Sequence, residues 1–117
     1  MDLEPRLAIL REGGLLSDEN YGRVREIITF LREKHGLDIN EDNAAAFITH
    51  ICAAFERICK GEGIEPIDPE IYEETQQEPT FGRALKISTE IQKLHFILPD
   101  EELSYITMHI GVLLANN

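Results

Sequence analysis

The sequence predicts an all-α fold: a five-helix bundle with a short extra N-terminal helical segment. Apolar residues recur at spacings of three and four along most of the chain, and no stretch alternates apolar and polar residues as a half-buried strand does. Short turns containing Gly, Pro or Asp separate these stretches. A chain of 117 residues can bury one core without disulfides or metal. We therefore expect one domain, with an N-terminal arm over residues 1–16 and a helical bundle over residues 17–117.

The first two helices have well-marked ends. Pro5 suits the first turn of a helix over residues 3–12, and a Gly-Gly pair stops that helix. Ser17 or Asp18 can cap the next helix, which Gly36 ends. Its predicted buried stripe consists of Val24, Ile27, Ile28 and Leu31.

The stretch from Asn43 to Gly61 is predicted to be a helix with two different faces, capped by Asn40 or Asp42. His50 lies on a narrow flank of small residues, together with Arg57, where an imidazole would be approachable. The small residues of this flank are Ala46, Ala53 and Ala54. The broad apolar side consists of Ala44, Phe47, Ile48, Ile51, Phe55, Ile58 and Cys59.

The second half of the chain contains three more predicted helices. An Asp-Pro pair begins a short helix over residues 69–77, another helix covers residues 81–95, and Asp100 caps the last one. The stripe of the middle helix consists of Phe81, Ala84, Leu85, Ser88, Ile91 and Leu94 or His95. The stripe of the last helix consists of Leu103, Ile106, Ile110 and Leu113.

Charge narrows the choice of partners. The chain has 22 Asp and Glu against 11 Lys and Arg, a formal charge of −11, so direct nucleic-acid binding is disfavoured. The N-terminus lacks the basic and apolar regions of a signal peptide, and no apolar run approaches the roughly 18 residues of a membrane span. We expect a cytoplasmic protein without a membrane contact.

Four histidines are the candidates for chemistry. His35 and His95 fall at predicted helix ends, where an imidazolium favours the negative end of the helix dipole. His50 and His109 lie at mid-helix beside the apolar stripes, and His109 has Glu102 and Tyr105 nearby on its helix. Each is either a half-buried core residue or part of a site.

Metal and nucleophilic chemistry are weakly supported. His50, His109 and Glu102 could contribute to a metal site, but no HxxxH, CxxC or ExxH pattern presents two ligands on one face. No cofactor motif occurs either.

Cys52 and Cys59 are seven residues apart in one helix, about 10 Å along its axis, too far for a disulfide. We expect both to be reduced, buried core residues.

Reversible phosphotransfer fits an approachable histidine flanked by small residues. A neutral imidazole nitrogen can attack a phosphoryl group with in-line access and little other help. Arg57 lies two turns from His50 on the same flank and could hold the phosphate, although a solvated surface arginine is an equally good interpretation.

Two segments resemble the PTS regulation domain (PRD) family, whose members respond to the sugar phosphotransferase system. One is THICAAFERICKGE, and the other is DEELSYITMHIGVLL, whose histidine follows the first by 59 residues. The likeness covers roughly Val24 to Leu114. The residues that stand at the family's positions are His50 with Glu56 and Arg57, and His109 with Glu102, Tyr105 and Ile110.

The resemblance implies a five-helix, usually dimeric, regulatory domain of antiterminators and transcriptional activators rather than an enzyme. It implies that HPr or a sugar-permease domain phosphorylates His50 or His109 and alters dimer packing, with Arg57, Glu102 and Tyr105 in support. Family regulators usually carry tandem PRDs and a nucleic-acid-binding domain, whereas this chain has one PRD, so we expect a stand-alone module. Many members have an acidic residue directly before the first histidine, where this chain has Thr49.

Our leading hypothesis is therefore a homodimeric regulatory module that accepts phosphate on His50 or His109 and modulates a partner or transcription. A structural partner protein with a PRD fold that takes no phosphate is the main alternative. A small helical metal-binding protein is a weaker one.

Overall fold

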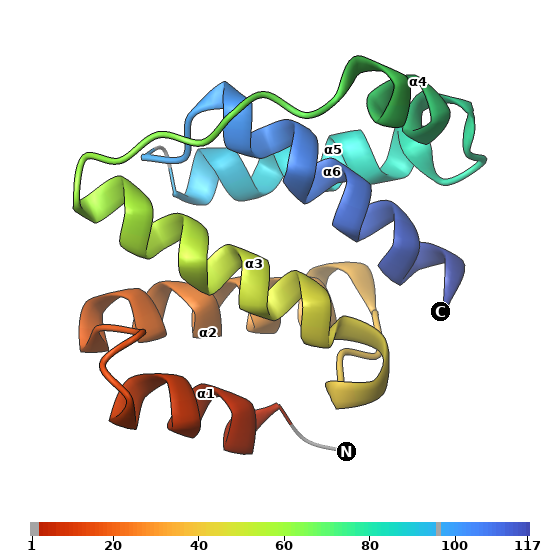
Figure 1. The fold of residues 1–117 in the computed structure, drawn as a ribbon. Coiled ribbons are helices and arrows are strands. Elements are labelled where there is room, and N and C mark those ends of the chain that lie inside the picture. The colour runs from red at the N-terminus through yellow and green to blue at the C-terminus, as the bar shows by residue number, and fades with distance from the viewer. Residues whose placement is uncertain (1–2, 96) are drawn as a thin grey trace. The chain divides into compact units, whose positions relative to one another are not determined.

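The structure is a computed structural model that describes residues 3–95 and 97–117. The described residues form six α-helices and no strand, which confirms the all-α prediction. We expected five helices plus a short extra segment, whereas the described residues form six helices. The N-terminal segment is itself the helix α1. Contacts group the chain into two compact units, Met1–Gly61 and Glu62–Asn117 (Figure 1). The division into an arm and a bundle at residue 17 stays a prediction.

Unit 1 (residues 1–61) contains α1 (Glu4–Glu12), α2 (Asp18–His35) and α3 (Glu41–Cys59). α2 packs against both α1 and α3. The predicted stripe of α2 is fully confirmed, because all four of its residues are buried. The buried apolar residues of unit 1 are Leu3, Leu7, Leu16, Val24, Ile27, Ile28, Leu31, Leu37, Ile39, Ala44, Phe47, Ile48, Ile51, Cys52, Ala54 and Phe55.

The ends of these helices follow local rules. Ser17 is the N-cap of α2 and accepts from the N–H of Asn20 at 3.2 Å. Gly36 ends α2 with φ 61°, in the left-handed region that favours glycine. Asn40 caps α3 through a reciprocal pair of hydrogen bonds with Asn43.

Unit 2 (residues 62–117) contains α4 (Pro69–Gln77), α5 (Phe81–Leu94) and α6 (Asp100–Ala115). α5 and α6 form its main helix pair, and α4 packs on both (Figure 1). The core combines Leu98 with residues of α5 and α6, whereas α4 has no buried residue. The buried apolar residues of unit 2 are Ala84, Ile87, Ile91, Leu98, Ile106, Ile110, Leu113 and Leu114.

Two details of unit 2 differ from the sequence prediction. Leu85 is exposed, because the buried face of α5 includes Ile87 in its place. Of the two alternatives at the end of the predicted stripe, His95 is buried and Leu94 is exposed. Asp100 is not the cap of α6: Pro99 occupies that position without a side-chain bond. The Asp100 carboxylate accepts instead from Gln92 Nε2 at 3.0 Å, which ties α6 to α5.

Candidate functional site

His50 is the tenth of the 19 residues of α3 and is half-buried. Ala46 and Ala53, one turn to either side, are exposed, whereas Ala54 is buried. Two small exposed neighbours leave the imidazole unscreened by long side chains of its own helix. Arg57 lies seven residues further along the same helix and is also half-buried. The approachable flank that the sequence predicted is therefore partly present, with Ala54 assigned to the core.

Arg6 of α1 binds Thr49, the residue before His50 in the sequence. Its Nη1 donates to the Thr49 hydroxyl at 3.0 Å, and its Nε and Nη2 donate to the Glu41 carboxylate at 3.0 and 2.5 Å. The hydrogen bond from Arg6 holds the pKa of Glu41 below its usual range, and the same bond raises that of Arg6. The N-terminal helix is thus fastened to α3 at the residue that precedes the candidate phosphate acceptor. Spacing within one helix carries no signal for this contact.

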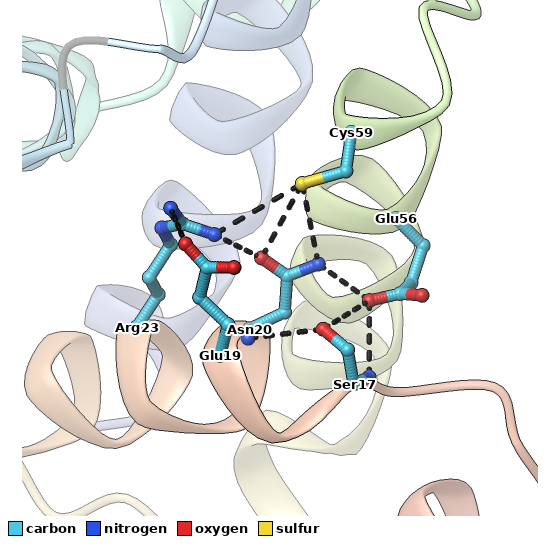
Figure 2. Close-up of polar contacts among 6 residues, drawn as sticks. All are labelled: Ser17, Glu19, Asn20, Arg23, Glu56 and Cys59. Carbon is cyan, nitrogen blue, oxygen red and sulfur yellow. Dashed lines mark hydrogen bonds and ion pairs between the residues drawn. The ribbon is translucent and has the colours of Figure 1, made fainter.

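Glu56 joins the end of α3 to the start of α2 (Figure 2). Its Oε2 accepts from the Ser17 N–H at 3.1 Å, from the Ser17 hydroxyl at 3.2 Å and from Asn20 Nδ2. Burial pushes the pKa of Glu56 upward, but the hydrogen bonds from Asn20 and Ser17 outweigh it, so the net pKa is lowered. Glu56, part of the family-like segment, therefore stabilises a helix junction.

Cys59 corrects the sequence prediction about the cysteines. Cys52 is buried as expected, but Cys59 is exposed at the last turn of α3. Its Sγ lies 3.6 Å from Asn20 Nδ2 and 4.0 Å from Arg23 Nη1, at the edge of the Glu56 cluster (Figure 2). A polar cluster at the helix end, rather than the core, receives this side chain. Burial raises the pKa of the Cys52 thiol to about 12, which keeps it protonated and unreactive at neutral pH.

His109 is the tenth of the 16 residues of α6 and is half-buried. Glu102, two turns earlier, is buried with 2% of its surface exposed. The Tyr105 hydroxyl, one turn earlier, donates to the Glu65 carbonyl at 2.8 Å and so fastens the segment before α4 to α6. Tyr105 therefore stabilises the fold of unit 2 and also lies one turn from His109 on α6.

The histidines at helix ends stand where the sequence put them. His35 is the last residue of α2, with its ring 5.1 Å from that of Phe30 in an edge-to-face arrangement. His95 follows the last residue of α5 and is buried.

The described residues contain no group of three or more His, Cys, Asp or Glu side chains that could hold a metal ion. Across the same residues, no helix has the length and apolar content to cross a membrane.

His50 belongs to unit 1 and His109 to unit 2, and both fall within residues 25–113, which match the family model of the PRD domain. The chain belongs to the PRD family. Uncharacterized protein YhfY of Escherichia coli (strain K12) is 27% identical over 115 residues, covering 97% of this PRD chain and 90% of the relative. No solved structure matches the chain.

Proposed function

We propose that this PRD is a regulatory module that accepts a phosphoryl group on His50 or His109 from the sugar phosphotransferase system. The observation that carries the proposal is the half-buried, mid-helix position of both histidines within a PRD. Neither side chain serves as a helix cap, and each keeps part of its surface open to a donor protein. HPr or a sugar-permease domain is the proposed donor.

The reaction needs little from the acceptor. A ring nitrogen with a free electron pair attacks the phosphorus of the donor's phosphohistidine, a new P–N bond forms, and the old P–N bond breaks. The donor imidazole leaves with the electron pair of that broken bond, so no net proton is gained or lost. In-line access is the main requirement, and the exposed Ala46 and Ala53 beside His50 favour it.

Charge favours His50 over His109 as the main acceptor. Residues 1–61 contain eight Lys and Arg against 11 Asp and Glu, whereas residues 62–117 contain three against 11. A phosphate adds about −1.5 to −2 charge at neutral pH, so its cost rises in acidic surroundings. Arg57 lies on the same helix as His50, and Arg6 is bound at the neighbouring Thr49. The guanidinium group of Arg57 would offset the added charge, whereas that of Arg6 is already paired with the Glu41 carboxylate.

The response we propose is a change in association. Added negative charge at an interface between two acidic chains weakens or rearranges it. A homodimer is the proposed resting assembly, and its regulatory output would pass through a partner or transcription complex.

The test is incubation with HPr, its phosphorylating enzyme and phosphoenolpyruvate, followed by intact-mass measurement. We expect a phosphate-sized mass increase that His50→Ala reduces more than His109→Ala does, and that the double variant abolishes. His35→Ala is the matched control, because His35 ends a helix instead of standing at its middle. An increase that persists in the double variant would overturn the acceptor assignment.

A structural PRD that takes no phosphate is the second candidate, favoured by one observation. The Thr49 hydroxyl, where many members have an acid, is occupied by the Arg6 contact. No mass increase, together with a partner complex that is indifferent to His50→Ala, would support this candidate instead.

Sedimentation velocity before and after the phosphorylation reaction shows whether phosphorylation changes the oligomeric state.

A further inference from the structure

We propose that a groove between α4 and α6 of unit 2 docks a segment of a partner protein that presents an apolar side chain flanked by Lys or Arg. The groove has a volume of about 370 Å³, within the range of pockets that hold ligand-sized groups. Its lining residues belong to α4, the turn between α4 and α5, the start of α5, and α6. No histidine lines it, so this inference is independent of phosphotransfer.

Four apolar residues that line the groove are partly open to solvent. Phe81 and Met108 are half-buried, whereas Ile71 and Val112 keep 46% and 57% of their surfaces exposed. Exposed apolar side chains that line one concavity are typical of a binding surface, unlike single exposed apolar residues scattered over a protein.

α4 forms the outer wall of the groove and is lightly held. None of its residues is buried. Tyr72 contacts Phe81 edge-to-face with ring centroids 6.0 Å apart. A separate contact fixes the start of α5 against α6: the Thr80 hydroxyl donates to the Gly111 carbonyl at 3.2 Å. A partner can thus complete the burial of α4 that the unit itself leaves unfinished.

The acidic residues at the groove favour a positively charged partner. Glu74 and Glu78 line the groove, and between Lys60 and Arg83 the sequence has seven acidic residues and no Lys or Arg. Such a one-sided field accelerates the approach of a basic segment and rejects acidic ones.

Other occupants fit these charges less well. A second copy of this chain brings another formal charge of −11, and nucleic acids and anionic membranes are also negative. An apolar anchor with basic neighbours suits both the apolar and the acidic residues that line the groove.

The probe is a fluorescein-labelled amphipathic helical peptide with Leu on one face and Lys on the other, followed by fluorescence anisotropy. Two control peptides accompany it: one with the same composition in shuffled order, and one with Ser in place of Leu. We expect the amphipathic peptide to bind more tightly than either control, and its affinity to fall as salt is raised.

Matched variants locate the binding. Val112→Lys should weaken peptide binding about tenfold, because it removes an anchor contact and repels the peptide. Leu94→Lys should change it less than about twofold, because Leu94 is similarly exposed at 49% but lies outside the groove. In the same way, Glu74→Gln should weaken binding more than Glu73→Gln, its neighbour outside the lining.

Chemical-shift mapping on the wild-type protein locates the peptide without relying on a variant that could misfold. In ¹H–¹⁵N spectra the peptide should shift amides of residues 71–81 and 107–115. Shifts centred elsewhere, equal effects within either variant pair, or a dimer that Val112→Lys dissociates would overturn the proposal. The last outcome would assign the groove to a second copy of the chain.

Discussion

Glu56 shows how one carboxylate can couple two helices that are far apart in sequence. Its Oε2 receives three donors from Ser17 and Asn20, and Ser17 is also the N-cap of α2. The cap therefore depends on α3 being in place, and the end of α3 depends on the cap. Hydrogen bonds to an ionised group are stronger than neutral ones, so ionisation of Glu56 matters to this junction.

Glu56→Gln should lower the free energy of unfolding by about 1 to 2 kcal/mol at neutral pH, because it removes the charge that its donors satisfy. The folded-state pKa of Glu56 is lowered, so its contribution is complete above the unfolded pKa of about 4.3. It is lost as pH falls through the folded pKa. Urea unfolding at several pH values should show wild type and variant converging in acid.

Glu33→Gln is the control for this substitution, since Glu33 is exposed on α2. We expect a change within about 0.5 kcal/mol. A difference between wild type and Glu56→Gln that stays constant down to acidic pH would contradict the role of the ionised carboxylate.

At the scale of elements, helix ends decide how this chain folds. α2 begins at a side-chain cap and stops at a glycine in the left-handed region, and both signals are legible in the sequence. α6 begins without a side-chain cap, because Pro99 holds the cap position and Asp100 is already the first residue of the helix. The Asp100 carboxylate accepts a tertiary hydrogen bond from Gln92 of α5.

Gly22, inside α2, and Gly36, at its C-cap, should respond in opposite ways to alanine. Gly22 lies inside the helix, and an added Cβ meets nothing within 4 Å, so Gly22→Ala should stabilise the protein by about 0.5 to 1 kcal/mol. Gly36 has equally open space but φ 61°, so Gly36→Ala should destabilise it by about 1 kcal/mol. Changes of the same sign in chemical denaturation would contradict this assignment of α2 and its end.

At the scale of the whole chain, charge is unevenly distributed. Residues 62–117 carry three of the 11 Lys and Arg but half of the 22 Asp and Glu. Self-repulsion opposes the compact state, whereas individual ion pairs such as Arg6–Glu41 support it.

Salt should therefore stabilise this protein. Raising ionic strength from about 0.01 M to about 0.15 M shortens the screening length from about 30 Å to about 8 Å and weakens the net repulsion. We expect the thermal unfolding midpoint, followed by circular dichroism, to rise by about 2 to 5 °C. A falling midpoint would mean that ion pairs outweigh the repulsion.

The sequence predicts the positions of the helices better than it predicts the side-chain contacts between them. Helical spacing predicts a segment for each of the six helices in the described residues, although the predicted cap of α6 is wrong, and the buried stripe of α2 is correct residue by residue. Spacing within one helix cannot show what a neighbouring helix offers. It therefore misses the Arg6 contact at Thr49 and places Cys59 in the core, although a polar cluster from α2 receives its sulfur. The mid-helix positions of His50 and His109 could be predicted from the sequence, because they follow from local spacing, whereas their role as phosphate acceptors stays a prediction.

Tyr105 offers a means to observe this chain without labels. The sequence has three tyrosines and no tryptophan, so its intrinsic ultraviolet emission comes from tyrosine alone. The Tyr105 hydroxyl is bound to the Glu65 carbonyl and lies one turn from His109. Any event at His109 that breaks this bond would change the emission of a native chromophore. Comparison with Tyr105→Phe would isolate that signal from those of Tyr21 and Tyr72.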